Sequence, residues 1–177
     1  FFSATLTRET GELAQSLLND PVHVQASPSA CTLDSIDQQV FFVDQNSKNS
    51  LLLDLLSKED MKRVLVFART KHRADKVAQM LSKNSIQADA IHGNKSQNQR
   101  TKAMYDFKSG RLRVLVATDI AARGIDVADI SHVINFDLPS EPECYVHRIG
   151  RTGRAGADGK AYSFCAADER NILRSIE

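Results

Sequence analysis

Residues 64–91 read VLVFARTKHRADKVAQMLSKNSIQADAI, and they hold the pattern that decides the fold. The continuous apolar run Val64–Phe67 is typical of a strand buried on both faces, and a second short run follows at Ala88–Ile91. Between them, the spacing i, i+3, i+4, i+7 of Ala74, Val77, Ala78 and Leu81 predicts a helix over about 71–82 with one buried face. A strand, a helix and a strand in this order predict a parallel sheet covered by helices.

The same alternation continues on both sides of this unit. Further strands are predicted at 40–43, 114–117, 133–136 and 161–165, and further helices at 50–56, from 96 to about 110, from 140 and from about 168. Ser96 with Gln99, and Ser140 with Glu143, have the spacing of capping boxes at helix starts, and Pro142 is tolerated in a first turn. Glycines from Gly150 onward predict a loop there. The expected fold class is α/β, a mostly parallel β-sheet with helices on both faces.

The first 36 residues differ from this pattern. Residues 1–25 contain one short helical pattern, at Leu13, Leu17 and Leu18, and one short strand at Val22–Val24, too little to bury a core. Residues 26–36 are rich in Ser, Thr, Pro and Asp without periodicity, which is typical of a linker. Residues 37–177 are therefore predicted to form the main domain.

Composition excludes some functions without naming one. Of 177 residues, 42% are apolar and 25% charged, and the net charge is +1, so an anion-binding surface must be local. The three cysteines are too far apart for a metal or redox pair, and we expect them to be small buried residues in a reducing cytoplasm. No apolar run is long enough to span a membrane, and no metal site is predicted.

Residues 147–154, His-Arg-Ile-Gly-Arg-Thr-Gly-Arg, carry the strongest functional signal. Arg148, Arg151 and Arg154 recur every three residues among glycines, so their guanidinium groups lie on a backbone that can approach a ligand closely. This chemistry suits phosphate, and such a loop can supply an arginine finger in phosphoryl transfer. The alternative is a solvated basic loop.

Two weaker groups follow strands. Residues 117–126, which include Thr118, Arg123 and Asp126, come directly after a buried strand, where ligands bind in open α/β sheets; alternatively, their polar groups only cap a turn. His92 and Gly93 precede a helix start that carries Arg100, a favourable place for a phosphate backbone. Here the alternatives are a structural histidine and a solvated arginine.

Taken together, residues 3–5, 64–70, 97–100, 118–126 and 147–154 resemble, in order and spacing, the later motifs of the DEAD-box RNA helicases. Residues 69–72 and 92–97 are most similar to those of the bacterial RhlE-type subgroup. The resemblance covers essentially the whole chain. It implies a RecA-like fold, with residues 37–177 as the second of two domains that close on ATP and RNA.

The resemblance also implies roles for individual residues. Arg151 and Arg154 would reach the ATP phosphates, Asp126 the ATP ribose, and His147 the first domain, while Arg148 would mainly hold the interdomain surface. Contacts to RNA would come from four residues, namely Arg69, Gly93, Arg100 and Thr118. Gln97 and Arg123 would hydrogen-bond each other. Ser3 and Thr5 would belong to the end of the first domain, so residues 1–25 would be its remnant.

The chain departs from the family pattern in what it lacks. It contains no GxxxxGK[ST] loop, no Asp-Glu-Ala-Asp tetrapeptide and no adenine-recognising segment, so Mg²⁺ is expected to be held by the missing first domain. The chain alone should therefore not hydrolyse ATP. Two other functions are weighed: a DNA helicase or translocase of the same superfamily, and a module of this fold that only docks partners. The Arg-Thr-Gly-Arg ending argues against the first, and the retained charged residues argue against the second.

Overall fold

The computed structural model describes residues 8–24, 36–57, 61–122, 125, 127, 129–153 and 158–177. They belong to two units, 1–30 and 31–177, which are described separately. In the first unit, helix α1 (Arg8–Leu17) confirms the helical pattern. The predicted strand at Val22–Val24 is wrong: among the described residues, 22–24 form no strand, and both valines are 88% exposed. A strand needs a neighbour for its backbone hydrogen bonds.

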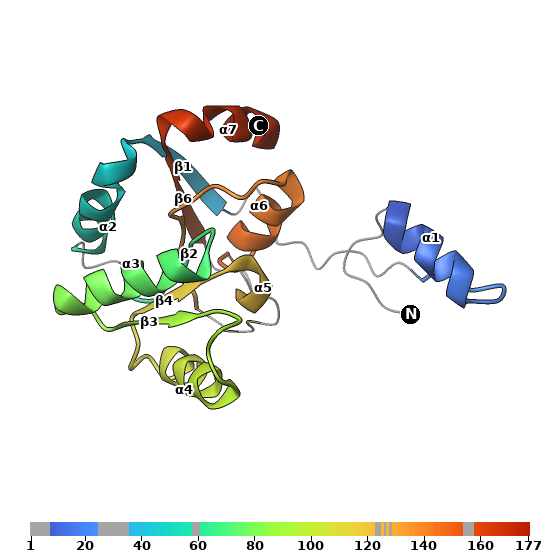
Figure 1. The fold of residues 1–177 in the computed structure, drawn as a ribbon, viewed down its shortest axis with the longest axis horizontal. Helices are drawn as coiled ribbons and strands as arrows, with labels where there is room; N and C mark the ends of the chain where they lie inside the picture. The colour runs from blue at the N-terminus through green and yellow to red at the C-terminus, as the bar shows by residue number, and fades with distance from the viewer. Residues whose placement is uncertain are drawn as a thin grey trace. The chain divides into compact units, whose positions relative to one another are not determined.

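The second unit is built on a six-stranded sheet in the order β1-β6-β5-β2-β4-β3 (Figure 1). Every neighbouring pair of strands is parallel. The strands are β1 (Ile36–Phe42), β2 (Val64–Phe67), β3 (Ala88–Ile91), β4 (Val114–Ala117), β5 (His132–Asn135) and β6 (Gly159–Cys165). Ile36 is the first residue of β1, so the sheet begins one residue before the predicted start of the domain. The α/β fold class is confirmed.

Six helices are described in this unit, and they cover both faces of the sheet (Figure 1). They are α2 (Lys48–Leu56), α3 (Lys71–Lys83), α4 (Gln97–Lys108), α5 (Asp119–Ala122), α6 (Pro142–Ile149) and α7 (Arg170–Ile176). Alternate strand residues point to opposite faces. Val64 and Val66 therefore pack with α2 and α3, whereas Leu65 and Phe67 pack with α4 and α5. Helices α6 and α7 lie on the second of these faces, over β6.

The helix starts test the two predicted capping boxes. At α4 the box is confirmed, because Ser96 Oγ accepts from the Gln99 N–H at 3.3 Å and Gln99 Oε1 accepts from the Ser96 N–H at 2.9 Å. At α6 the box is wrong: the helix begins at Pro142, and its N-cap residue, Glu141, makes no capping hydrogen bond through its side chain. Proline favours the first helical position and keeps the residue before it extended, which moves the start two residues beyond Ser140.

The topology brings four loops to one edge. Because all six strands run in the same direction, the segments that follow β2, β3, β4 and β5 leave the sheet at its carboxyl edge. These segments begin at Ala68, His92, Thr118 and Phe136. Three of the predicted RNA-contacting residues, Arg69, Gly93 and Thr118, lie in them.

Candidate functional site

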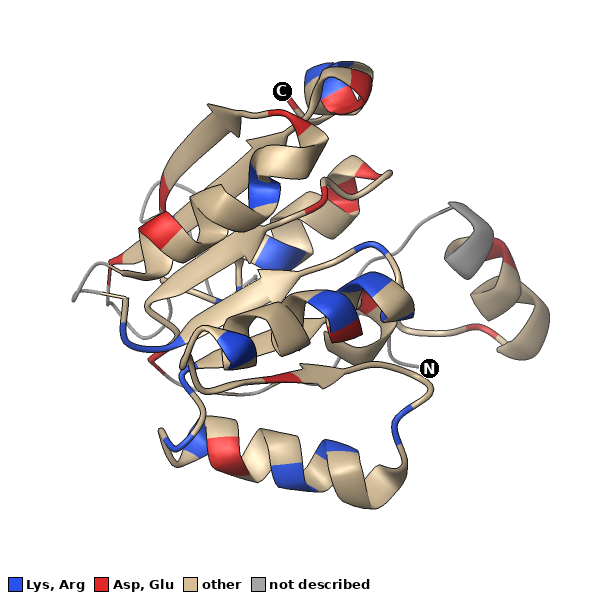
Figure 2. Cartoon of the chain, turned by 60° about the vertical axis from the view of Figure 1, so that its left-hand side comes forward, with Lys and Arg blue, Asp and Glu red and all other residues tan. Residues whose placement is uncertain are grey.

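The described basic residues of this unit are interspersed with acidic ones. Figure 2 shows Lys and Arg distributed over α3 and α4 with acidic residues among them, in keeping with the net charge of +1. A binding site for an anion must therefore be built from particular side chains. The loops at the carboxyl edge supply the candidates.

Thr118 lies where β4 passes into α5. Its N–H donates to Ile91 O at the end of β3 at 3.4 Å, and its carbonyl accepts from the Ala122 N–H at 2.9 Å, the first turn of α5. The side chain is half-buried. Thr118 thus connects the ends of two neighbouring strands to the start of a helix.

The first turn of α4 presents Gln97 and Arg100. Arg100 Nη1 lies 3.5 Å from Gln97 Oε1, and Arg100 Nε is buried with no hydrogen-bond partner among the described residues. Gly93 is exposed, and a Cβ added to it would meet nothing within 4 Å. Packing inside the domain therefore does not require glycine at this position, and the space beside its backbone is open.

His92 and Asp75 fix the turn that carries Gly93. His92 is buried, and its Nε2 lies 3.0 Å from Asp75 Oδ1, the same oxygen that Lys95 Nζ approaches at 3.0 Å. His92 Nδ1 accepts from the Asn94 N–H at 3.3 Å. Burial acts to raise the pKa of Asp75, but hydrogen bonds from His92 and Lys95 outweigh it and hold this pKa below its ordinary value. His92 has the environment of a structural histidine, the alternative considered above.

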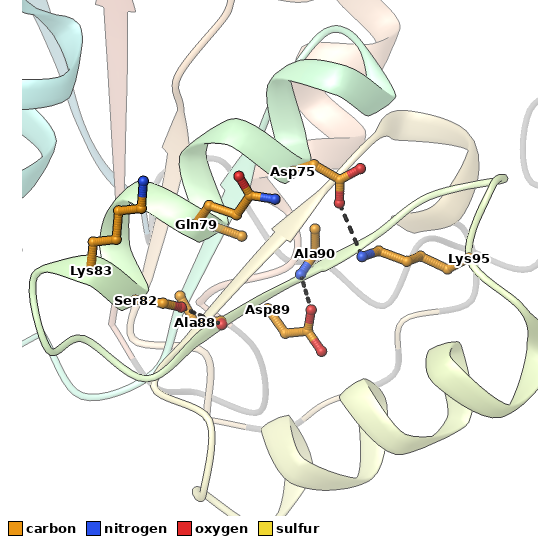
Figure 3. A pocket seen from close by; sticks show the side chains of 9 residues that line it. Asp75, Gln79, Ser82, Lys83, Ala88, Asp89, Ala90 and Lys95 are labelled. Carbon is orange, nitrogen blue, oxygen red and sulfur yellow. Dashed lines mark hydrogen bonds and ion pairs between the residues drawn. The ribbon is translucent and has the colours of Figure 1, made fainter.

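Asp75 and Lys95 also line a shallow pocket beside β3 (Figure 3). Strand β3 lies at the edge of the sheet, and two side chains there form hydrogen bonds with its backbone. Asp89 Oδ1 accepts from the Ala90 N–H at 2.7 Å, and Ser82 Oγ donates to Ala88 O at 3.2 Å. Side chains that bond an edge in this way reduce its capacity to pair with another strand.

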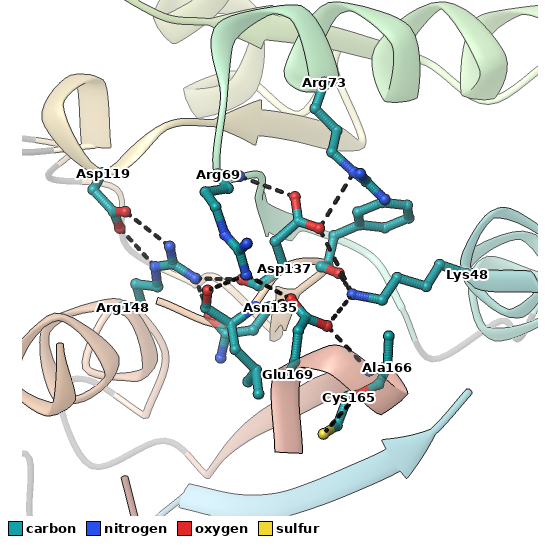
Figure 4. A network of polar contacts seen from close by, with 12 residues as sticks. Lys48, Arg69, Arg73, Asp119, Asn135, Asp137, Arg148, Cys165, Ala166 and Glu169 are labelled. Atoms are coloured by element: carbon teal, nitrogen blue, oxygen red, sulfur yellow. Dashed lines mark hydrogen bonds and ion pairs between the residues drawn. The ribbon is translucent and has the colours of Figure 1, made fainter. Parts of the chain in front are cut away.

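Arg148 lies inside the domain and is only 2% exposed. Its Nε and Nη2 donate to the two carboxylate oxygens of Asp119 at 2.6 and 2.8 Å, and its Nη1 donates to Asn135 Oδ1 at 3.1 Å and to Asp137 O at 2.7 Å (Figure 4). The guanidinium carbon lies 4.9 Å from the centre of the Phe67 ring. The side chain thus joins α6 to the ends of β2, β4 and β5, so any contribution to an interdomain surface is made through these partners.

A second set of buried charges continues from Asp137 (Figure 4). Lys48, which is 0% exposed, donates to Glu169 at 2.5 Å and lies 3.6 Å from Asp137 Oδ1. Glu169 also accepts from Arg69 Nη2 at 2.8 Å, and Asp137 pairs with Arg73 Nε at 3.2 Å. Arg69 keeps about half of its side chain exposed (48%), so Glu169 holds one side of its guanidinium group while the rest faces solvent.

The loop after α6 carries Arg151. Its N–H donates to Arg148 O at 3.1 Å, and its Nη1 donates to Ile125 O at 3.1 Å. The next residue, Thr152, is buried and donates to Ile130 O. The loop packs closely on the start of β6: a Cβ at Gly159 would lie 2.4 Å from Gly153 N, so only glycine fits there.

The structure brings some of the predicted residues together, and others lie outside the described part of the chain. Thr118 and Gly93 are brought to neighbouring strand ends, and Arg148 and Arg151 share one turn of backbone. His147 is exposed on α6. Five of the predicted residues lie outside the described residues, namely Ser3, Thr5, Arg123, Asp126 and Arg154. The expected hydrogen bond between Gln97 and Arg123 therefore lies outside them as well.

The partners that hold Arg148 and Arg69 were not among the predicted residues. Asp119 and Asp137 each follow a buried strand, so the rule that singled out Thr118 would have found them as well. Lys48 and Glu169 give no such signal, since a charged residue in the first turn of a helix or in a loop is normally solvated. Only the fold brings these two residues together, 121 positions apart.

In the described part of the chain, no group of three or more His, Cys, Asp or Glu side chains could hold a metal ion. None of the helices seen there has the length and apolar character needed to cross a membrane.

Comparisons with known proteins agree with this fold. The family described as "Helicase conserved C-terminal domain" matches residues 47–156. The DEAD-box ATP-dependent RNA helicase CshA of Bacillus subtilis is 42% identical over 176 residues, which are 99% of this chain and 36% of that protein. The chain thus spans about a third of that relative's length.

Solved structures give the same result. The E. coli DEAD-box protein SrmB, solved with the regulator of ribonuclease activity A, is 40% identical with a TM-score of 0.76, over 80% of this chain and 84% of that one. A DEAD box protein from the hyperthermophile Methanococcus jannaschii is 43% identical with a TM-score of 0.77, over 99% of this chain and 47% of that one. This chain therefore belongs to the DEAD-box helicases and carries their conserved C-terminal, RecA-like domain.

Proposed function

We propose that this chain supplies the second RecA-like domain of an ATP-dependent RNA helicase of the RhlE type, with residues 37–177 as that domain, 26–36 as the linker and 1–25 as the end of the first domain. The intact protein would hydrolyse ATP and separate short RNA duplexes locally. The similarity of residues 69–72 and 92–97 to the RhlE-type subgroup supports the finer assignment. We place the protein in the cytoplasm, whose reducing conditions suit the free thiols of Cys144 and Cys165.

The observation that carries the proposal is the surface that α5 and α6 present. Ile120 is 80% exposed and Val146 43% exposed, and the two helices that bear them are joined by the Asp119–Arg148 pair. Exposed apolar side chains on fixed helices, beside the exposed His147, are typical of a surface that another domain covers. This supports docking of the first RecA-like domain against α5 and α6.

ATP would be bound between the two domains. Arg151 and Arg154 would neutralise charge that develops on the transferring phosphoryl group, and Asp126 would accept a hydrogen bond from the ribose. Mg²⁺ and the attacking water would be held by the first domain. The half-buried Arg151, whose loop is anchored on both sides, fits the role of a positioned cation. The chain alone offers one wall of this site and should bind ATP weakly and not hydrolyse it.

RNA would be bound through its backbone. The buried Nε of Arg100, the half-exposed Arg69, the open space beside Gly93 and the hydroxyl of Thr118 suit phosphates and sugars rather than base edges. Little dependence on RNA sequence is expected.

An ATPase assay of the intact protein tests the proposal. Single-stranded RNA should stimulate hydrolysis, and DNA of the same sequence should not. Equal stimulation by DNA would favour a DNA translocase, and no ATP hydrolysis with either nucleic acid would favour a docking module. Calorimetric titration of the present chain with ATP completes the test, since micromolar affinity would contradict the division of the site between two domains.

A further inference from the structure

Asp119 and Arg148 lie between the predicted RNA contact at Thr118 and the predicted ATP contact at Arg151. Asp119 is the residue directly after Thr118, and Arg148 lies in the last turn of α6, three residues before Arg151. Their side chains form an ion pair with two hydrogen bonds, of 2.6 and 2.8 Å. The two predicted contacts are therefore separated by one short chain of bonds.

On the ATP side, Arg148 contacts both the sheet and the Arg151 loop. Its Nη1 donates to Asn135 Oδ1 and Asp137 O at the end of β5, and its carbonyl accepts from the Arg151 N–H at 3.1 Å. A displacement of Arg148 therefore moves the start of the loop that carries Arg151.

On the RNA side, Asp119 is the first residue of α5. The Thr118 carbonyl accepts from the Ala122 N–H in the first turn of this helix, and Ala121 and Ala122 pack against the sheet. The bond from Asp119 to Arg148 adds a polar constraint to this packing. It therefore helps to set how the start of α5, and with it Thr118, is oriented.

The pair also differs in burial from the Lys48–Glu169 pair, one of several other ion pairs in this region. In the pair of Lys48 with Glu169 both side chains are buried, at 0% and 3% exposure, whereas the Asp119 side chain is 39% exposed. Water can solvate Asp119 if its bond opens, but it cannot reach Lys48 or Glu169 without unfolding the region. Of the two pairs, the one with Asp119 is thus the one that can be made and broken in the folded protein.

We propose that the Asp119–Arg148 pair is the positioning element that couples RNA binding at Thr118 to ATP binding at Arg151. RNA held by Thr118 orients α5, α5 orients the guanidinium of Arg148, and Arg148 orients the Arg151 loop. Neither residue touches RNA or ATP. The inference rests on the proposed function, and it adds a residue pair that sets how strongly the two ligands depend on each other.

The test measures that dependence in the intact protein. The affinity for a non-hydrolysable ATP analogue is measured without RNA and with saturating single-stranded RNA, and the ratio of the two dissociation constants gives the coupling. Asp119→Asn keeps the size of the side chain and removes its charge. Its coupling ratio is expected to fall at least about fivefold below that of the unchanged protein, the lower end of typical coupling between sites. Asp119→Glu, which restores the charge, should recover part of the ratio.

The control is Asp106→Asn. Asp106 is a half-buried carboxylate on α4 that pairs with Lys102 at 3.0 Å and Arg111 at 2.8 Å, so the variant loses the same charge from a comparable ion pair. Its coupling ratio should equal that of the unchanged protein. A drop in Asp106→Asn equal to that in Asp119→Asn would overturn the inference, because the effect would then not be specific to this pair.

The remaining outcomes separate the inference from the proposed function. If the unchanged protein shows no coupling between RNA and the analogue, the proposed function fails. If it shows coupling that Asp119→Asn retains, only the inference fails. If Asp119→Asn weakens binding of the ATP analogue equally with and without RNA, the inference also fails. The pair would then only stabilise the fold and would not couple the two ligands.

Discussion

Two clusters of charged residues hold loops at the carboxyl edge of the sheet, and each pairs a buried base with a partly exposed carboxylate. Around Arg148, the guanidinium group is 2% exposed and makes four hydrogen bonds of 2.6–3.1 Å, and its partner Asp119 is 39% exposed. Around Asp75, which is 36% exposed, one carboxylate oxygen approaches both the buried His92 and Lys95 at 3.0 Å. The first cluster fixes the segments beside the predicted ATP contacts, and the second fixes the turn beside Gly93.

The difference shows that a short ion-pair distance does not by itself indicate a large free energy. An exposed pair contributes about 0 to 1 kcal/mol, because water and salt screen it. Removing one partner of a buried pair costs about 3 to 5 kcal/mol, because the other partner loses its solvation as well. Loss of the buried Arg148 should therefore cost much more than loss of the partly exposed Asp75.

The largest effect is expected where an arginine acts on the reaction itself. In the intact protein, Arg154→Ala should lower kcat by about 10³ to 10⁵, roughly 4 to 7 kcal/mol, while KM for ATP changes little, because a finger arginine acts mainly in the transition state. Arg154→Lys should restore little, since lysine lacks the planar guanidinium group. Steady-state kinetics measures both variants. Near-normal kcat with a raised KM would assign Arg154 to substrate binding instead.

The next effect is on stability, and it compares a buried with an exposed arginine. Arg148→Ala should lower the free energy of unfolding by about 3 kcal/mol, the low end of the buried range because Asp119 can be solvated. Arg111→Ala is the matched control: Arg111 also pairs with an aspartate, Asp106, at 2.8 Å, but its side chain is 60% exposed. Its loss should cost about 0 to 1 kcal/mol. Urea unfolding of this chain measures both, and equal costs would show that burial of the arginine does not set the cost.

The fold could be predicted from the sequence because its strands are continuous apolar runs. The runs at 64–67, 88–91 and 114–117 are strands with those bounds. Elsewhere the bounds shift, since the strands predicted at 40–43 and 133–136 are observed at 36–42 and 132–135. Two larger errors have local causes. Val22–Val24 has strand composition but no neighbouring strand among the described residues, and Ser140 has capping composition but is followed too closely by Pro142, which sets the helix start itself.

The site could be predicted only where its residues form motifs along the chain. Gln97, Arg100 and Thr118 are of that kind. The residues that hold those motifs in place come from distant segments, as Lys48 meets Phe136 O across 88 positions and Arg69 meets Glu169 across 100. No spacing in the sequence reports such contacts, because they depend on how the strands are ordered in the sheet.

A smaller effect is expected at the RNA-facing side. Arg100→Ala in the intact protein should weaken ATP-dependent RNA binding about tenfold, or about 1.4 kcal/mol, and to the same extent for all sequences, because a phosphate contact carries no base information. The slope of log affinity against log salt should decrease by about one charge. Thr118→Ala should weaken binding similarly without changing the slope, which makes it the matched uncharged control. Loss of affinity for one RNA sequence alone would show that these residues read bases.

The smallest effect is expected at the partly exposed Asp75, and its size depends on pH. Hydrogen bonds from His92 and Lys95 hold the pKa of Asp75 below its ordinary value of 3.8, so the ionised carboxylate stabilises the folded chain above that pH. This contribution is lost as pH falls through the lowered pKa of the folded state. Asp75→Asn should therefore cost about 0 to 1 kcal/mol at pH 7, and the difference from the unchanged chain should shrink below about pH 4. Urea unfolding from pH 7 to pH 3 measures it, with Asp129→Asn as the control, because Asp129 is 87% exposed and lies 3.9 Å from Arg63. A cost near about 3 kcal/mol would show that the Asp75 cluster is as strong as the cluster around Arg148. A cost that does not change with pH would show that the charge of Asp75 does not stabilise the fold.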